Sequence, residues 1–367
     1  MRILFSAQNF KNEVAGAELC AQTLLKNLAK KHDVEVVSRG ENGDYEWEGI
    51  KVHEVKCPNN ILYINLFWSR YLDRLKTKPD LVITQLNAAA PTEFWAKKKG
   101  IPCIFYVHSF EHFCLESFKF GDVFGCGQRC SQCTGARTKI LSPLYSLIYS
   151  RNKKALREAD VVISPSRFMQ EVVRHYSGVD SYVVPNPMEL EGYRAGRKGD
   201  TILFVKALKH KGVDLVGKLV KRLPNRKFTI VGDLDPDYAW LAKEENVEYM
   251  GRIADMREAY AKARIVLIPS NMAESFSRVT VEAMINGLPV ITSDKGGPAE
   301  TSGAAGINIP TDDVQGWADA IEKLYKDEGY YREKCRASLK ESKRYDLEKS
   351  LEIFHDLVKR KTGLKLL

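Results

Sequence analysis

Short runs of β-branched and other apolar residues recur along the chain, and longer stretches with helical spacing separate them. These runs are apolar on both faces, which is typical of parallel strands that helices cover on both sides. In the first half they predict strands at Arg2–Ser6, Val34–Val37, Leu81–Thr84, Ile104–Val107, Val161–Ser164 and Tyr182–Val184. In the second half they predict strands at Thr201–Val205, Lys227–Val231, Val247–Met250, Ile265–Ile268 and Val290–Thr292.

The alternation of strands and helices stops in the glycine- and charge-rich stretch Gly192–Gly199 and resumes at Thr201. We therefore predict an α/β protein with two doubly wound, Rossmann-like domains, 1–190 and 191–345, that face an interdomain cleft. The remaining stretch, 346–367, is amphipathic, and we expect it to form a helix that returns to the first domain.

With 367 residues, 44% of them hydrophobic and 28% charged, the chain is long enough for two folded domains. A formal net charge of +9 indicates an anionic partner. The basic clusters Lys97–Lys99 and Arg151–Arg157 are either solvated helix faces or a peripheral membrane contact, and no nucleic-acid-binding signature accompanies them. The chain opens directly into a strand, so we expect a cytoplasmic protein, with association at the cytosolic face of a membrane left open.

The segment with the richest chemistry follows the predicted strand Ile265–Ile268. A polar loop that contains Glu274 leads into a helix predicted from about Ser277 to Asn286, which Gly287 ends. This arrangement predicts polar side chains around the start of a helix, at the carboxyl end of a strand, where ligands of such sheets bind.

The amino end of this predicted helix has free backbone amides, which favour a phosphate, and it contains Ser275, Phe276 and Ser277. Arg278 adds a positive charge there. Glu282 lies inside the helix, and a carboxylate accepts hydrogen bonds from vicinal hydroxyls such as those of sugars and ribose. A capped helix with a glutamate in its early turns explains the same residues without a ligand. The spacing alone leaves both interpretations open.

The whole segment from Glu274, E-S-F-S-R-V-T-V-E-A-M-I-N-G-L-P-V-I, resembles the E-x7-E signature of family 4 glycosyltransferases. Shorter motifs that resemble those of the family occur in its usual order: Val14–Glu18 (its glycine loop), Val107-His108, Ile163–Ser166, Val184–Pro187, Lys211-Gly212, Val231–Asp233, Gly251-Arg252 and Ile268–Ser270. The resemblance implies the GT-B fold and the transfer of a sugar, with retention, from a nucleotide-diphosphate sugar to a hydroxyl acceptor. It makes 1–190 the acceptor-side domain and 191–345 the domain that binds the donor.

The resemblance also implies roles in the second domain. Glu274 is expected to bind hydroxyls of the donor sugar, and Glu282 those of the ribose. The amides of Phe276 and Ser277 are expected to bind phosphate or sugar oxygens, while Lys211 neutralises the diphosphate that leaves.

Further roles concern the first domain and the base. Gly16 is expected to let the backbone approach the diphosphate, and His108 to face the donor sugar, although a histidine after a strand can also be purely structural. The backbone near Arg252 and Ile253 is expected to hold the nucleobase of a UDP- or GDP-sugar.

Negative charge that develops on the leaving diphosphate is the main obstacle to transfer at neutral pH. Lys211, Arg278 and helix amides supply fixed positive charge, so we expect no catalytic metal. The family implies a front-face mechanism, in which a diphosphate oxygen helps to deprotonate the acceptor. Polysaccharide, glycolipid and small-glycoside acceptors all remain open, including lipid-linked ones.

One position departs from the family pattern. An arginine usually precedes the lysine by a few residues, but Ala207 stands at that place here. Lys206 is one residue away and would point to the opposite face of a regular strand, unless the chain bulges there. Lys209 and His210 are alternative sources of the missing charge.

The segment 109–143 shows no clear helix or strand period and holds half of the cysteines. A loop of this length is usually functional or disordered, and its phenylalanines argue against disorder. Those phenylalanines could contact an apolar acceptor or form a small core of their own. Its four cysteines could hold a structural zinc ion, form disulfides or stay as thiols; they are Cys114, Cys126, Cys130 and Cys133.

Two other functions stay open on the sequence. A nucleotide-sugar epimerase with the same fold would use the same donor site without an acceptor. A basic scaffold for membrane or nucleic acid would use the fold alone, and the set of Glu274, Lys211 and His108 argues against it.

Overall fold

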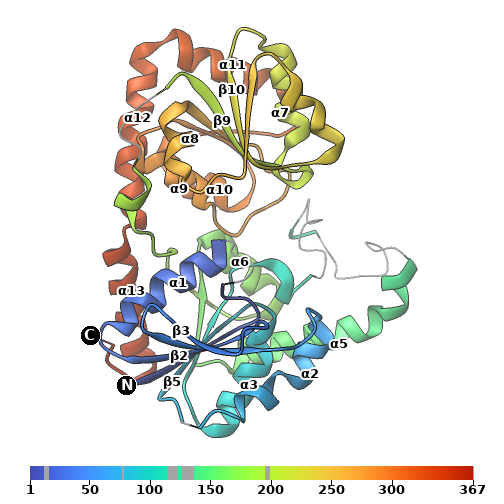
Figure 1. Cartoon of the computed structure of the whole chain (residues 1–367), viewed down its shortest axis with the longest axis vertical. Helices are drawn as coiled ribbons and strands as arrows, with labels where there is room; N and C mark the ends of the chain where they lie inside the picture. Colours follow the sequence, from blue (N-terminus) through green and yellow to red (C-terminus); the bar gives the residue numbers. More distant parts are fainter. Residues whose placement is uncertain (12–15, 77, 115–122, 126–135, 195–198, 367) are drawn as a thin grey trace. The chain divides into compact units, whose positions relative to one another are not determined.

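The computed structural model describes residues 1–11, 16–76, 78–114, 123–125, 136–194 and 199–366. The chain divides into two compact units, each with its own sheet (Figure 1). The first unit contains Met1–Met188 and Glu348–Leu367, and the second contains Glu189–Leu347.

The sheet of the first unit has the order β3-β4-β2-β1-β5-β6-β7-β8. All neighbouring strands are parallel, except that β3 runs antiparallel to β4. The strands are β1 (Arg2–Ala7), β2 (Asp33–Arg39), β3 (Asp44–Trp47), β4 (Ile50–Val55), β5 (Leu81–Gln85), β6 (Cys103–Tyr106), β7 (Val161–Ser164) and β8 (Tyr182–Val183).

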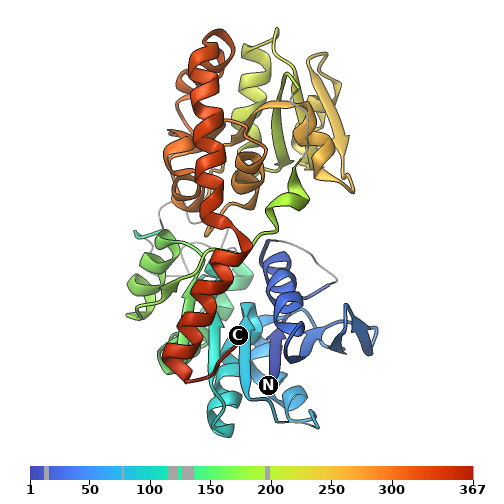
Figure 2. The ribbon, with the colours of Figure 1, turned by 90° about the vertical axis from the view of Figure 1, so that its left-hand side faces the viewer.

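Helices cover both faces of this sheet, because side chains alternate along each buried strand. Ile3 and Phe5 share one core cluster with residues of α1 and α13, whereas Leu4 belongs to another with residues of α2 and α3. Both chain ends lie in this unit, where His32 Nε2 is 3.0 Å from the carbonyl oxygen of Leu366 (Figure 2). The helices are α1 (Gly16–Ala29), α2 (Ile61–Leu72), α3 (Ala89–Lys99), α5 (Ala136–Glu158), α6 (Arg167–Ser177) and α13 (Leu347–Thr362), with short 3-10 turns η1 (Leu86–Ala88) and η2 (Phe110–His112).

The sheet of the second unit is wholly parallel, in the order β11-β10-β9-β12-β13-β14. Its strands are β9 (Thr201–Ala207), β10 (Phe228–Leu234), β11 (Val247–Gly251), β12 (Ala263–Ile268), β13 (Val290–Ser293) and β14 (Gly306–Ile309). Ile202 and Phe204 pack with residues of α7 and α11, while α8 contacts β9 and α9 contacts β12. The helices are α7 (Val213–Arg222), α8 (Met256–Lys262), α9 (Arg278–Ile285), α10 (Gly296–Ser302), α11 (Val314–Lys326) and α12 (Glu328–Ser342), with 3-10 turns η3 (Leu190–Tyr193), η4 (Lys209–Lys211), η5 (Pro236–Lys243), η6 (Gly303–Ala305) and η7 (Lys343–Tyr345).

Every strand predicted from the sequence is present, and two parallel-stranded α/β units confirm the predicted fold class. The prediction missed β3, β4 and β14. The expectation of an irregular segment up to residue 143 was wrong at its end, because α5 begins at Ala136 and contains Pro143 in its interior.

Candidate functional site

An ion pair between Lys211 and Glu274 lies at the carboxyl ends of β9 and β12. Lys211 Nζ is 2.8 Å from Glu274 Oε2, and both side chains are largely buried. The other carboxylate oxygen, Oε1, accepts a hydrogen bond from the hydroxyl of Ser270. The structure therefore brings together a cation and a carboxylate that are 63 residues apart in the chain.

Glycine residues allow the backbone to form this arrangement. Gly212 follows Lys211 with φ +87°, and a Cβ atom there would lie 2.0 Å from the carbonyl oxygen of Pro269. A Cβ atom on Gly297 would lie 2.7 Å from both the Glu274 carbonyl oxygen and the Phe276 nitrogen. The Gly297 amide donates to that Glu274 oxygen at 2.7 Å, so it holds the loop before α9 in place.

Helix α9 begins one residue after Ser277, as predicted. The Ser277 side chain caps the helix by accepting from the amide of Thr280 at 3.3 Å. Within the described part of the chain, the amides of Phe276 and Ser277 donate to no other group. Ser275 is half-buried, and the Phe276 ring packs edge-on against Tyr345. Two available donors thus lie two and three residues beyond Glu274 along the chain.

The second glutamate of the motif, Glu282, is only 7% exposed. The hydroxyl of Tyr260 donates to Glu282 Oε2 at 2.8 Å, and Arg278 Nη2 lies 3.6 Å from Oε1. Burial raises the pKa of Glu282, while the Arg278 charge and the Tyr260 hydrogen bond oppose that rise. Arg278 also donates to the hydroxyl of Tyr193 at 2.6 Å, and its Nε and Nη1 atoms are buried with no hydrogen-bond partner among the described residues.

The pairing of β9 with β10 is irregular at Lys206, so the regular alternation that would direct this side chain away from the site is interrupted there. Lys206 has φ +58°, and the register between β9 and β10 shifts between Val231 and Leu234. Burial lowers the pKa of His210; the charge of Lys211 and, less strongly, that of the exposed Lys206 add to this effect, whereas Glu274 opposes it. Lys209 forms an ion pair with Asp237.

Arg252 follows β11 and is exposed, with its guanidinium 2.6 Å from an oxygen of Asp233. Ile253 is partly buried, and the preceding Gly251 has φ +62°. The expectation of no catalytic metal also assumed that the chain has no Asp-x-Asp pattern, which is wrong, because Asp233, Asp235 and Asp237 alternate in it. Asp235 accepts from the amide of Asp237 at 3.1 Å, so each of the three carboxylates already contacts a donor.

In the first unit, His108 lies just beyond the carboxyl end of β6. Its ring stacks on Tyr106, with the centroids 5.0 Å apart. Burial lowers the pKa of His108 to about 4, so the imidazole is neutral at pH 7. Burial and the charge of Glu18 raise the pKa of nearby Glu111 to about 7. Gly16 is the first residue of α1; Val14 and Ala15 of the predicted glycine loop lie outside the described residues.

Of the four clustered cysteines, only Cys114 lies within the described residues, where it is partly buried. Cys126, Cys130 and Cys133 lie outside them. In the ranges that the structure describes, no three histidine, cysteine, aspartate or glutamate residues are placed to hold a metal ion together. No described helix is both long enough and apolar enough to cross a membrane.

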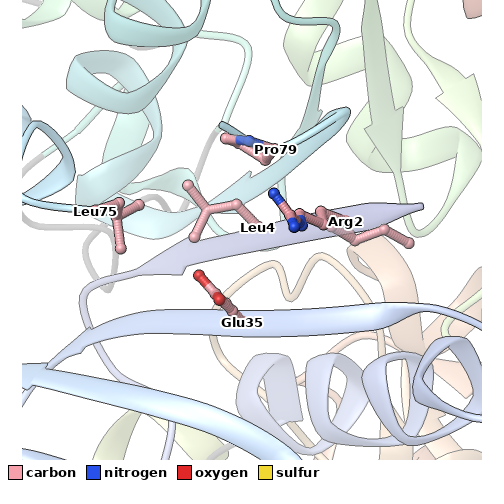
Figure 3. Close-up of a pocket in the computed structure, with 6 residues that line it drawn as sticks. Arg2, Leu4, Glu35, Leu75 and Pro79 are labelled. Atoms are coloured by element: carbon pink, nitrogen blue, oxygen red, sulfur yellow. The ribbon is translucent and has the colours of Figure 1, made fainter. Parts of the chain in front are cut away.

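A small pocket opens at the amino end of β1 (Figure 3). Arg2 and Glu35 are its only charged lining residues, and Leu4, Leu75 and Pro79 line it with them. Because β1, β5 and β6 are parallel, this pocket is at the edge of the sheet opposite to His108. It is therefore separate from the strand ends at which the predicted site residues lie.

Solved structures with the same fold include a complex with UDP and a sucrose-phosphate synthase. Anabaena Alr3699/HepE in complex with UDP aligns with a TM-score of 0.76 at 18% identity, covering 99% of this chain and 100% of that one. The sucrose-phosphate synthase of Thermosynechococcus elongatus aligns with a TM-score of 0.74 at 17% identity, covering 98% of both chains.

Family models match both halves of the chain. The model "Glycosyltransferase Family 4" matches residues 14–191, and the model "Glycosyl transferases group 1" matches residues 199–327. The chain is a glycosyltransferase with the GT-B fold. Neither model describes an epimerase, so the alternative enzyme class is not favoured.

Curated relatives of this glycosyltransferase include an uncharacterized 42.6 kDa protein in the cps region of Klebsiella pneumoniae, which is 24% identical over 82% of this chain and 87% of the relative. The D-inositol 3-phosphate glycosyltransferase of Corynebacterium aurimucosum is 30% identical over 46% of this chain. The phosphatidyl-myo-inositol mannosyltransferase of Mycolicibacterium smegmatis is 30% identical over 41% of it. The matched segments span about half of these last two relatives, 49% and 44%.

Proposed function

We propose that this glycosyltransferase is a retaining enzyme of family 4 that moves a sugar from a nucleotide-diphosphate sugar to a hydroxyl acceptor. The observation that carries the proposal is the Lys211–Glu274 ion pair beside two amides, of Phe276 and Ser277, that have no acceptor among the described residues. Together they offer a cation, a carboxylate and two fixed donors to one ligand. A sugar diphosphate has hydroxyls for the carboxylate and anionic oxygens for the other three groups.

Donor binding would redistribute the contacts of the ion pair. Sugar hydroxyls donate to Glu274, whose Oε1 is held by Ser270, and the diphosphate becomes the partner of Lys211. The α9 amides add fixed dipoles that need no rearrangement as charge develops on the leaving group. Complexes of Anabaena Alr3699/HepE with UDP and with UDP-glucose support a UDP-sugar donor, with GDP-sugars as the second class to test.

The ribose would bind at Glu282, which Tyr260 and Arg278 hold in a fixed orientation. Arg278, expected from the sequence to meet phosphate directly, contacts Glu282 and Tyr193 instead, and its two unpartnered N–H groups remain for the ligand. The backbone of Arg252 and Ile253 would hold the base.

Lys206 would take the place of the missing arginine. Its positive φ and the β9–β10 register shift remove the regular alternation that would otherwise direct it away. Lys206 and Lys211 then supply two positive charges toward the diphosphate, with no catalytic metal required. Transfer would proceed by the front-face mechanism, with a diphosphate oxygen as the base.

The first unit would serve the acceptor and the reacting carbon. His108 is neutral at pH 7, so it offers one hydrogen-bond donor and one acceptor to the sugar rather than a charge. Gly16, at the amino end of α1, would place backbone amides against the diphosphate. Relatives named for mannosyl transfer to phosphatidyl-myo-inositol support a lipid-linked acceptor, reached by peripheral contact with the cytosolic face of a membrane.

A donor panel tests this proposal. The full chain is incubated with UDP- and GDP-sugars, with and without a mixture of lipid and soluble hydroxyl acceptors, and released nucleotide diphosphate is measured. We expect acceptor-dependent release, a product with the anomeric configuration of the donor, and its loss in Glu274→Gln but not in the exposed control Glu333→Gln. Isomerised donor without acceptor would instead indicate an epimerase. Full cellular function of Glu274→Ala would favour a scaffold.

A further inference from the structure

Tyr193 is tied to both ends of α9, although it belongs to η3 at the start of the second unit. At the amino end of the helix, its hydroxyl accepts a hydrogen bond from Arg278 Nη2 at 2.6 Å. At the carboxyl end, its carbonyl oxygen accepts one from Asn286 Nδ2 at 2.7 Å. The same Asn286 amide also donates to the carbonyl oxygen of Glu282. Both the backbone and the ring of Tyr193 are therefore fixed relative to the helix that contains Glu282.

Arg278 occupies a position that disfavours a cation. It is the first residue of α9, where the helix dipole is positive, and its side chain is only 10% exposed. Its Nη2 atom is 3.6 Å from Glu282 Oε1, which is longer than a normal hydrogen bond. The short contact of the guanidinium is the one with the Tyr193 hydroxyl. Tyr193 rather than Glu282 therefore fixes the guanidinium.

The separation of Arg278 from Glu282 leaves one carboxylate oxygen open. Tyr260 donates to Oε2, and among the described residues no donor lies within hydrogen-bond distance of Oε1. A guanidinium that is free to approach a carboxylate forms a two-pronged contact with it, which is the geometry that such pairs prefer. The Tyr193 hydroxyl holds Arg278 back from that contact. Oε1 thus keeps its lone pairs for another donor, while the positive charge nearby favours the ionised carboxylate.

We propose that Tyr193 is a positioning residue of the donor site: it holds Arg278 away from Glu282, so that Oε1 stays open to the ribose hydroxyls of the donor. The proposal rests on the role of Glu282 in the proposed function and deepens it. Its consequence is selection of ribonucleotides, because a nucleotide without ribose hydroxyls gains nothing from an open Oε1. Tyr193 acts on the ribose only through Arg278.

Calorimetry on the full chain tests this role with UDP and with its dideoxy analogue, which lacks both ribose hydroxyls. Tyr193→Phe keeps the ring and removes the hydroxyl. We expect it to weaken UDP binding by about fivefold, because Arg278 then closes on Oε1 and one hydrogen bond to the ribose is lost. Binding of the dideoxy analogue should not change. Tyr330→Phe, at another partly buried tyrosine of the second unit, is the matched control and should bind both nucleotides as wild type does.

A second substitution shows whether Tyr193 acts through Arg278. In an Arg278→Gln background, Tyr193→Phe should change UDP binding no further, since the group that it positions is gone. Three results each overturn the positioning role: equal weakening of both nucleotides by Tyr193→Phe, weakening of neither, and the same weakening in the Arg278→Gln background.

Two further measurements separate this proposal from the proposed function. Glu282→Gln should abolish the preference for UDP over the dideoxy analogue, and a preference that persists shows that Glu282 does not bind the ribose, which refutes that part of the proposed function. A crystal structure of Tyr193→Phe needs no ligand and should show Arg278 in a two-pronged contact with Glu282. A guanidinium that stays where wild type has it overturns the positioning role, even if wild type binds UDP.

Discussion

Replacing Tyr260 by phenylalanine isolates one hydrogen bond to the buried carboxylate of Glu282. The ring of Tyr260 is fully buried, so phenylalanine keeps its packing and removes only the hydroxyl, which donates to Oε2 at 2.8 Å. A hydrogen bond to a charged group contributes about 1.5–3 kcal/mol. We expect the free energy of unfolding to fall by about that amount at a pH at which Glu282 is ionised.

The pH dependence of this loss follows from the pKa of Glu282. Burial raises that pKa and the Tyr260 hydroxyl opposes the rise, so the variant has a still higher pKa. A raised pKa stabilises the folded state below the unfolded-state pKa, and that stability is lost as pH rises through the folded-state value. The variant therefore loses more stability than wild type as pH rises, and the two free energies of unfolding converge at low pH, where Glu282 is protonated.

Urea unfolding at pH 5 and pH 8 is the assay, with Tyr345→Phe as the control. Tyr345 is also buried, but its hydroxyl donates to the neutral carbonyl of Thr301 at 3.0 Å. Loss of this hydroxyl should lower the free energy of unfolding by about 1 kcal/mol at either pH. If Tyr260→Phe costs the same at both pH values, the hydroxyl does not stabilise a charged Glu282, and the description of this carboxylate is wrong.

Other predictions concern single features. Burial raises the pKa of Glu93 to about 7. The stability that the protonated carboxyl contributes is therefore lost as pH rises from about 4.5 through about 7. Relative to wild type, the free energy of unfolding of Glu93→Gln should increase by about 2–3 kcal/mol between pH 5 and pH 8 in urea titrations, and a constant difference would contradict this. Gly212→Ala should lower both the melting temperature and the donor affinity, because the added Cβ atom collides with the backbone of Pro269. The control is Gly178→Ala, at φ +73° with open space around it, which should lose only about 1–2 kcal/mol of stability through backbone strain. Lys206→Ala should weaken donor binding by roughly fivefold at low salt, as measured by calorimetry. Equal weakening in the exposed control Lys218→Ala would show that Lys206 does not bind the diphosphate.

The strands that the sequence predicted are those buried on both faces, since only they form unbroken apolar runs. Strand β4 alternates apolar and charged residues, and β3, beside it, is a short antiparallel edge that looks like connecting chain. Strand β14 has four residues, one of them glycine. Such strands form because neighbouring strands offer hydrogen-bond partners, and no local pattern records that tertiary context.

The limits of α9 were predictable because its start and stop signals are local: Ser277 caps its beginning, and Gly287 follows its end. The contacts of Arg278 and Glu282 were not predictable in the same way. Tyr193 is 85 residues from Arg278, and Tyr260 is 22 from Glu282, so their meeting depends on the folded unit. The irregular pairing of β9 with β10 at Lys206 likewise depends on the folded unit.

We propose that Glu274 binds the donor sugar while Lys211 binds its diphosphate. Calorimetry with free nucleotide diphosphate and with the corresponding nucleotide sugar, on wild type and Glu274→Gln, tests it most directly. Because Glu274 occupies Lys211 in the unliganded protein, the substitution should leave diphosphate binding unchanged or tighter and weaken sugar-donor binding by about tenfold or more. Equal effects on both ligands, or none on either, would contradict the account.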